Sequence, residues 1–297
     1  MSFSAGMRSA FYVLALTATL PMTASTALAS GARSDKLVLT GGVNAIEGAG
    51  GGGLATWALI GGLGTEDQYG GNAFYTNIAM DDFRLTSSGV LLGIRDRVEL
   101  SLARQRLDTQ DAGSALGIGR GFKISQDIFG IKVRLLGDAV LEQDSWLPQV
   151  SAGLQHKRND QAALLQALGA RDDSGTDFYL AASKLYLSSG VLLNATVRLT
   201  KANQLGLLGF GGDRNDSYRP QIELSAALLL RRDLALGAEY RSKPDNLSFA
   251  DEGDWASAFI AWQPNKNIAV TIAYTALGDI ATFSKQRGAY ISLQLGF

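Results

Sequence analysis

Apolar and polar residues alternate with a period of two along most of the chain. In residues 289–297 the odd positions hold Ala, Ile, Leu, Leu and Phe, and the even positions hold Tyr, Ser, Gln and Gly. Residues 191–200 and 267–276 repeat this alternation. Successive side chains of a strand point to opposite faces, so each segment predicts a strand with one apolar face and one polar face.

The predicted strands are long, and the links between them are of two lengths. Each alternating run covers about 9–12 residues, the length that crosses a bilayer at a tilt, whereas strands of soluble proteins average about 5–6 residues. Outer-membrane barrels combine tight periplasmic turns with long outer loops, and the links follow that rhythm. The short links lie at residues 95–96, 188–190, 231–232 and 264–267, and the long ones at roughly 108–125, 158–175, 201–217, 242–253 and 277–287.

Counting back from Phe297 gives twelve strands and two weaker candidates, residues 36–46 and 54–60. Twelve and fourteen are both even, so both ends of the wall lie on the periplasmic side. Lipid offers the backbone no hydrogen-bond partners, so the sheet must close. We therefore predict an all-β fold, a transmembrane antiparallel up-and-down β-barrel of 12–14 strands. The twelve stronger segments are residues 72–80, 83–94, 97–107, 126–136, 146–157, 176–187, 191–200, 218–230, 233–241, 254–263, 267–276 and 288–297.

The first 29 residues have the order of a secretory signal. Arg8 is their only charge, an apolar run follows at 10–16, and Ala27 and Ala29 offer small residues for cleavage before Ser30. The apolar run is shorter than the roughly 20 residues of a membrane-spanning helix. We predict a signal peptide at 1–29, a glycine-rich segment at 30–53 that is a first strand or a plug, a barrel at 54–297, and the outer membrane as the location.

Composition excludes several classes of protein. There are no cysteines, which excludes disulfides and thiolate metal sites. The formal charge is −1, so no basic nucleic-acid surface is expected. His156 is the only histidine, and we expect it to be exposed at the outer edge of a strand, without the partners that catalysis or zinc requires. We expect no metal, no cofactor and no nucleic-acid partner.

Two segments have local signals of their own. Gly48 to Gly53 is glycine-rich but lacks the Lys-Ser/Thr of a phosphate loop, so it indicates flexible backbone beside a lumen or a sharp bend. Residues 161–170 have helical character and predict a short helix in an outer loop.

The polar faces of the strands carry the chemistry that we expect in the lumen. The charges are of mixed sign, which suits either a water-filled pore or ion pairs that fill a closed interior. The predicted lumen-lining residues are Glu99, Lys132, Arg134, Lys184, Arg198, Glu223, Glu239 and Arg241.

Several segments together resemble a proteobacterial family of outer-membrane proteins, a domain of unknown function of about this length. They are residues 39–43, 46–54, 96–101, 238–247 and 278–283. The resemblance covers nearly all of the mature chain and implies family membership, but it implies no activity and carries over no catalytic residue. The terminal Phe297 resembles the signature that the outer-membrane assembly machinery reads.

Three functions remain after these observations. The first is a passive channel or transporter for a small solute, and the second is a structural or adhesive barrel with a filled lumen that acts through its extracellular loops. The third is an enzyme, and the missing catalytic constellation argues against it. The expected partners are outer-membrane lipid and lipopolysaccharide, the assembly machinery through Phe297, and a small-molecule solute.

Overall fold

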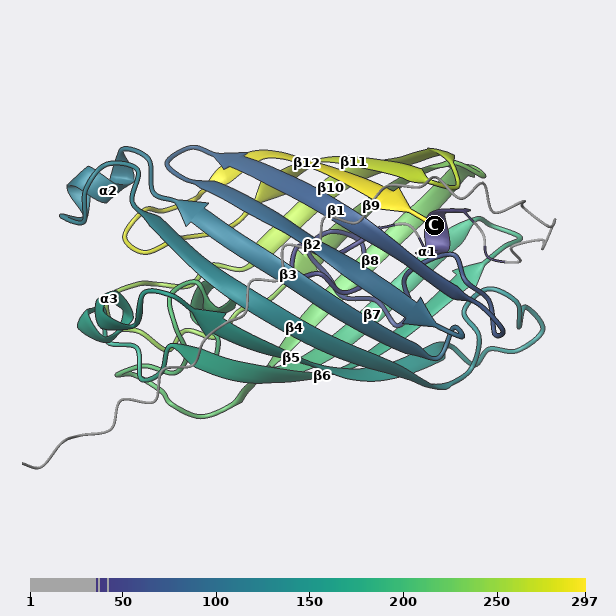
Figure 1. Cartoon of the computed structure of the whole chain (residues 1–297), viewed down its shortest axis with the longest axis horizontal. Coiled ribbons are helices and arrows are strands. Elements are labelled where there is room, and N and C mark those ends of the chain that lie inside the picture. The colour runs from purple at the N-terminus through teal and green to yellow at the C-terminus, as the bar shows by residue number, and fades with distance from the viewer. Residues whose placement is uncertain (1–35, 37, 42) are drawn as a thin grey trace, which may run out of the picture. The chain divides into compact units, whose positions relative to one another are not determined.

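Twelve antiparallel strands form the wall of the described chain and close into one barrel (Figure 1). The computed structural model describes Lys36, residues 38–41 and residues 43–297, so the predicted signal peptide lies outside the described residues. Each strand pairs with its neighbours along the chain, and β1 (Tyr69–Met80) pairs with β12 (Arg287–Gly296) to close the sheet.

The strands between these two follow the order of the chain. Short helices lie outside the wall strands, namely α1 (Val38–Gly41), α2 (Ala112–Ala115), α3 (Ala162–Ala167) and the 3-10 turn η1 (Asn203–Gly206). The remaining strands are β2 (Arg84–Ile94), β3 (Val98–Asp108), β4 (Lys123–Leu136), β5 (Gln149–Asn159), β6 (Ser174–Tyr186), β7 (Val191–Thr200), β8 (Arg219–Arg231), β9 (Leu234–Arg241), β10 (Trp255–Asn265) and β11 (Ile268–Ala276).

The structure confirms the predicted barrel and sets the number of strands at twelve. The short helix predicted within 161–170 is α3. The two weaker strand candidates, 36–46 and 54–60, are wrong, and the wall begins at Tyr69 rather than at residue 54. A wall strand buries only alternate residues, whereas every residue from 43 to 64 is buried. This segment therefore lies inside the barrel.

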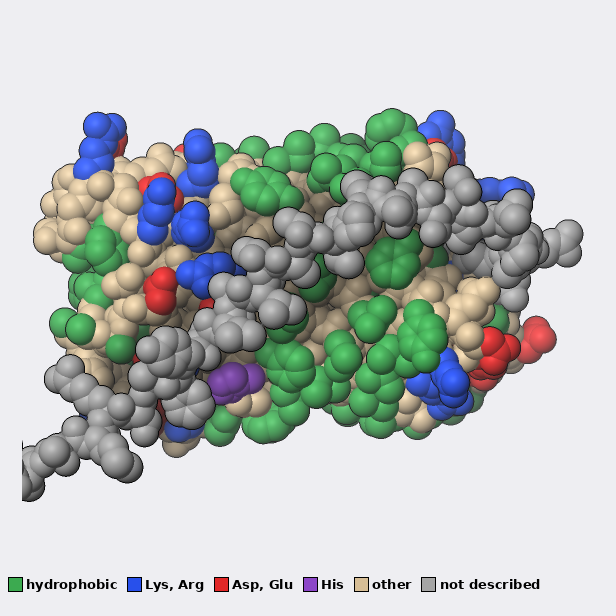
Figure 2. All heavy atoms as spheres, in the orientation of Figure 1, with side chains coloured by type: hydrophobic (Ala, Val, Ile, Leu, Met, Phe, Trp, Pro, Cys, Tyr) green, Lys and Arg blue, Asp and Glu red, His purple; other side chains and the backbone are tan. Residues whose placement is uncertain are grey.

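The outer face of the wall is apolar, as a lipid-facing surface requires. On β11 the side chain of Ile272 is 58 % exposed, while its neighbours Thr271 and Ala273 are buried. Figure 2 shows hydrophobic side chains gathered over the middle of the barrel. Among the described residues, none of the helices has the length and apolar character of a membrane-crossing helix.

The two ends of the barrel differ in their links. Residues 109–122, 160–173, 201–218, 242–254 and 277–286 form long links at the end that carries α2 and α3 (Figure 1). Two links depart from the predicted rhythm, since residues 81–83 make a tight turn at the long-loop end and residues 137–148 make a long link at the other end. The C-terminus lies at the short-turn end, which is the periplasmic end in outer-membrane barrels.

Candidate functional site in the barrel lumen

Residues 43–63, here called the plug, fill the lumen. The plug turns back on itself, with bridges between Asn44 and Gly50 and between Gly51 and Thr56. Its backbone also closes on itself where the Ile46 amide donates to the Gly53 carbonyl over 2.7 Å. A buried segment without regular structure must find partners for its remaining backbone groups, and here the barrel wall supplies them.

The glycine run forms the tightest bend of the plug. A Cβ atom on Gly51 would lie 2.2 Å from the Ala55 carbonyl oxygen, and one on Gly52 would lie 2.2 Å from Glu239 Oε1. Gly53 has a φ of +138°, in the region that favours glycine. The sequence Gly48–Gly53 is thus a sharp bend inside the lumen, where side chains at Gly51 and Gly52 would clash with their surroundings.

One buried ion pair holds both arms of the plug. Glu99 on β3 accepts hydrogen bonds from the amides of Gly50 and Gly61, over 2.9 and 2.7 Å. Lys132 on β4 lies 2.9 Å from the same carboxylate and donates to the carbonyls of Gly50 and Trp57, both over 3.1 Å. The two charges neutralise each other and satisfy four backbone groups of the plug.

Glu47 is the centre of a larger buried network. Its carboxylate contacts Lys157 on β5 and Arg241 on β9, and Arg198 on β7 lies 3.8 Å away. Arg198 Nε donates to Glu223 over 2.5 Å. The plug therefore brings its own anion to the cations of three separated strands, and loss of that anion would leave those cations buried without their partner.

Two further carboxylates cap backbone amides of the plug. Glu239 accepts hydrogen bonds from the amides of Leu54 and Ala55, over 2.8 and 3.3 Å. Glu223 accepts one from the amide of Thr56 over 2.7 Å. Charged groups that would favour water are thereby paired with main-chain donors.

The structure does not bring all eight predicted lumen residues together. Six lie around the plug, namely Glu99, Lys132, Arg198, Glu223, Glu239 and Arg241. Arg134 lies apart at the periplasmic mouth, 2.6 Å from Asp96 and 3.3 Å from Asp138. Lys184 lies on the opposite face of β6 from Ser183, which accepts from the plug amide of Ala58 over 2.9 Å.

Lys184 is buried by a different part of the chain. Its ammonium group donates to the main-chain oxygens of Glu142 and Leu147, in the long periplasmic link between β4 and β5. Sequence reasoning missed Glu47, Lys157 and Asp177, although Lys157 lies 2.7 Å from Asp177 within the network. Period-two alternation from Ser151 would have placed Lys157 inward.

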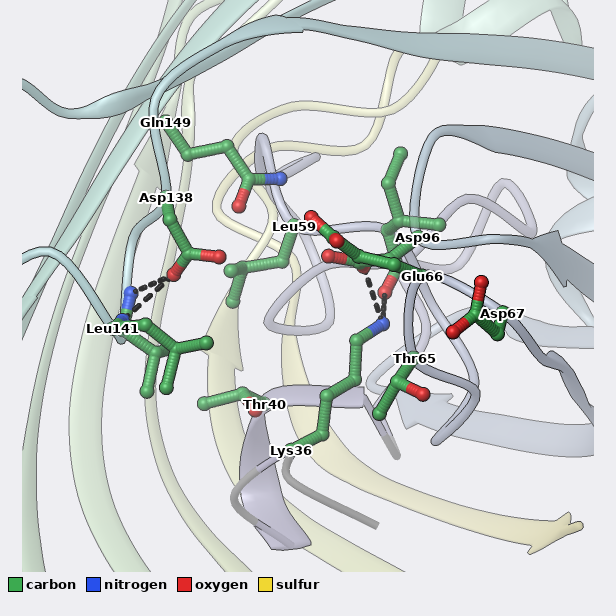
Figure 3. A pocket seen from close by; sticks show the side chains of 12 residues that line it. Lys36, Thr40, Leu59, Thr65, Glu66, Asp67, Asp96, Asp138, Leu141 and Gln149 are labelled. Atoms are coloured by element: carbon green, nitrogen blue, oxygen red, sulfur yellow. Dashed lines mark hydrogen bonds and ion pairs between the residues drawn. The ribbon is translucent and has the colours of Figure 1, made fainter.

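A cavity of about 260 Å³ opens at the periplasmic mouth (Figure 3). Lys36 reaches into it and lies 2.6 Å from Asp96, and it also donates to the plug carbonyls of Ile60 and Gly62 over 2.9 and 3.1 Å. The ion pair between Lys36 and Asp96 joins the chain that precedes the plug to the β2–β3 turn. The other carboxylates of the cavity belong to Glu66, Asp67 and Asp138.

The hydrogen bonds between residues 43–62 and the wall lie on one side of the barrel, although Trp57 of the plug shares an apolar cluster with Phe259 and Ala261 on β10. The hydrogen bonds that residues 43–62 make to the wall all end on β2 to β9. The facing strands β10, β11, β12 and β1 turn uncharged polar side chains inward, and several of their buried polar atoms have no hydrogen-bond partner in the described structure. These atoms belong to Gln263, Thr271, Gln294 and Asn72.

Loops close the other end of the lumen. The link after β7 folds inward, and Lys157 and Asn159 donate to the carbonyls of Leu205 and Gly206 over 3.1 and 3.2 Å. In the link between β9 and β10, at the same end of the barrel, the ammonium group of Lys243 lies 3.1 Å from the carboxylate of Glu252. Burial lowers the pKa of Lys243 and raises the pKa of Glu252. In this conformation loops cover the outer end of the lumen, and the plug occupies the space between them and the periplasmic cavity.

His156 lies outside the lumen. Its side chain is exposed on β5 and its Nδ1 lies 3.0 Å from Thr176 Oγ1 on the neighbouring strand. No cluster of metal-ligating side chains occurs among the described residues.

The fold, the apolar outer face and the polar interior define an outer-membrane β-barrel whose lumen is occupied by its own N-terminal segment. The chain belongs to the family described as "Protein of unknown function (DUF3034)", whose match covers residues 40–294. None of the curated proteins matches the sequence.

Solved structures of outer-membrane proteins are similar to the chain at low sequence identity. The KdgM porin superposes with a TM-score of 0.50 at 8% identity, covering 76% of this chain and 99% of that one. The outer-membrane channel COG4313 from Pseudomonas putida F1 gives 0.44 at 14% identity, with 77% and 95% coverage. Outer-membrane phospholipase A from Escherichia coli gives 0.40 at 11% identity, with 76% and 92% coverage. The likeness to the KdgM porin supports the fold.

Proposed function

We propose that this protein is a channel for small solutes in the outer membrane and that the plug keeps it closed. The observation that carries the proposal is the polar contact between plug and wall. Seven strands, β3 to β9, form polar contacts with the plug through carboxylates, cations, amides and hydroxyls, in addition to the apolar cluster that plug side chains share with the wall.

A wall that only had to be filled would gain nothing from this arrangement. Buried ion pairs contribute little net stability, and apolar residues of similar volume often replace them without loss. A wall that meets water when the plug moves must be polar. In the open channel Glu99, Lys132, Arg134, Arg198, Glu223, Glu239 and Arg241 would then line the lumen, as rings of charge do in selective pores.

The hydrogen bonds of the plug reach only part of the barrel wall, and this suggests where a solute passes. Buried polar atoms without partners are costly, and water satisfies such groups in protein interiors. The unpartnered groups of Thr271 and Gln294 on β11 and β12, with Asn72 on β1, therefore favour a hydrated path along that wall. The path would lie opposite β6, half a turn of the barrel away.

The remaining assignments complete the proposal. Residues 1–29 would direct export, and Phe297 would be read by the assembly machinery. Lipopolysaccharide of the outer leaflet would surround the loop end, and a small-molecule solute would be the cargo. A catalytic role is not part of the proposal, and the exposed His156 has the hydroxyl of Thr176 as its side-chain hydrogen-bond partner.

A disulfide between plug and wall tests the proposal. The chain has no cysteines, so the double variant A58C/S183C would carry a single possible disulfide at positions already in hydrogen-bond contact. In planar bilayers we expect stepped currents under applied voltage for the wild type and for the reduced variant, and loss of the steps on oxidation. The single variants A58C and S183C are the controls, since oxidation should leave their currents unchanged.

A structural or adhesive barrel is the second candidate, because the plug occupies the lumen and loops cover its outer end. Such a barrel would insert and fold but stay silent in every redox state. Currents that persist unchanged in the oxidised double variant would contradict the plug as the closing element.

A further inference from the structure

A basic hollow lies on the outer face of the barrel, outside the lumen. It has a volume of about 300 Å³ and opens among outward side chains of β2, β3 and β4. Figure 2 shows Lys and Arg side chains gathered over this part of the wall, toward the end that carries α2. The cations of the basic hollow are Arg84, Arg104, Arg106 and Lys123.

The strand register places these cations side by side. Arg84 on β2 is opposite Asp108 on β3, and Asp108 is opposite Lys123 on β4. Two residues further into the barrel, Arg106 is opposite Thr86. The hollow is therefore built by backbone pairing and does not depend on a mobile loop.

Most of this positive charge is uncompensated. Arg104 pairs with Asp127 over 2.8 Å and with Asp160 over 3.5 Å. Within the described part of the chain, Arg84, Arg106 and Lys123 form no ion pair. Asp108 is the one carboxylate that lines the hollow.

The depth of the hollow in the membrane follows from its neighbours. Along the same outward faces, the first apolar residues toward the middle of the barrel are Val90, Leu102 and Phe129, all exposed, with Ser125 and Asp127 between Lys123 and Phe129 on β4. The cations thus lie where the apolar band ends, at the loop end of the wall. Charges on the outward face cost least at this interface, and anionic lipid headgroups compensate them.

We propose that the basic hollow binds the phosphate groups of a phosphorylated glycolipid of the outer leaflet, of the lipopolysaccharide type. Guanidinium groups match phosphate oxygens in a bidentate geometry, and the hydroxyl of Ser88 offers a further donor. The site deepens the proposed contact with lipopolysaccharide, rests on that part of the proposed function, and does not require a conducting lumen.

Binding of lipid A to the purified full-length barrel in detergent tests the site. We compare diphosphorylated lipid A, its dephosphorylated form with the same acyl chains, and inorganic phosphate alone. The wild type should bind the diphosphorylated lipid most tightly, and added salt should weaken the binding. In R84Q/R106Q/K123Q the affinity should fall by roughly tenfold or more, because three charge-assisted contacts are lost.

The control variant R231Q/R232Q/K266Q removes the same charge from exposed positions at the periplasmic end and should bind as the wild type does. Should the triple variant fail to fold, R106Q alone should still weaken binding several-fold. Equal affinity of the wild type and both variants, or equal affinity for dephosphorylated lipid A, overturns the proposal. Competition by inorganic phosphate at the concentration of the lipid would overturn the assignment to a lipid headgroup. None of these results depends on conductance, so they are separable from a failure of the channel proposal.

Discussion

The ammonium group of Lys132 lies 2.9 Å from a carboxylate oxygen of Glu99, and both side chains are buried against the plug. Replacing Glu99 with Ala would leave Lys132 as an unpaired buried cation and would deprive the amides of Gly50 and Gly61 of their acceptor. We expect E99A to lose about 3–5 kcal/mol of unfolding free energy, the cost of breaking a buried ion pair. Urea unfolding of the barrel in lipid vesicles measures this loss.

The exposed pair of Arg231 and Asp233 is the control for E99A. Its atoms lie 3.1 Å apart at the surface, so D233N should cost less than about 1 kcal/mol. If E99A and D233N unfold at the same urea concentration, the Glu99–Lys132 pair does not hold the plug.

A substitution at Gly51 tests how tightly the bend of the plug is packed. A Cβ atom there would lie 2.2 Å from the Ala55 carbonyl oxygen and 3.1 Å from the Ala45 side chain. Backbone atoms cannot rotate away, so G51A should displace the plug at a cost of about 1–3 kcal/mol. Faster amide hydrogen exchange in residues 43–63, with unchanged exchange in the wall strands, is the expected readout.

Gly296 gives the matched control for that substitution. The atom nearest to a Cβ there lies 3.5 Å away, an ordinary van der Waals contact, so G296A should leave exchange in the plug as it is in the wild type. Unchanged plug exchange in G51A would show that the bend tolerates a side chain.

Much of the barrel is predictable from sequence because period-two alternation is a local signal. The segment 191–200 coincides with β7, and 267–276 differs from β11 (Ile268–Ala276) by one residue. The pattern fails where both faces of a strand are apolar. On β6 the inward residues include Tyr179 and Leu185, so alternation did not fix the face on which Lys184 lies.

The plug could not be predicted because its contacts join residues far apart in the chain. The amide of Leu54 reaches Glu239, which is 185 residues away, and no local pattern encodes that pairing. The apolar residues 54–60 look like a strand in sequence, but they are buried on every side. Only the closed wall shows that the lumen has room for them.

The buried pair of Lys243 and Glu252 at the loop end predicts a dependence on pH. Burial raises the pKa of Glu252, and Lys243 acts against that rise. In K243M the carboxylate loses its cation, so its folded pKa rises further above the unfolded value. The protonated form is then favoured in the fold, and the penalty of about 3–5 kcal/mol present at pH 8 should fade as the pH falls through the folded pKa.

Urea unfolding of K243M and the wild type at a series of pH values measures that trend. The double variant K243M/E252Q has no buried charge at these positions, and its difference from the wild type should vary little with pH. A penalty in K243M that is constant from pH 8 to pH 4 would contradict the assignment to Glu252.

Substitution of Thr271 tests the proposed hydrated path along β11, β12 and β1, the strands to which the plug forms no hydrogen bond in the described structure. Thr271 is fully buried, and its Oγ1 has no partner in the described structure. If that hydroxyl faced a dry interior, replacing it with a methyl group would stabilise the fold, because the unsatisfied group would be removed. If it faces a hydrated path, as we expect, T271V should leave stability within about 0.5 kcal/mol of the wild type. It should also slow an uncharged solute such as erythritol by roughly threefold, the factor for one lost hydrogen bond.

The variant T86V makes the same change on the outer face of β2 and should leave the flux unaltered. Erythritol efflux from vesicles that contain the full-length protein, measured by light scattering under a membrane potential that opens the wild type, provides the measurement. A more stable T271V with an unchanged flux would place the solute path elsewhere in the lumen.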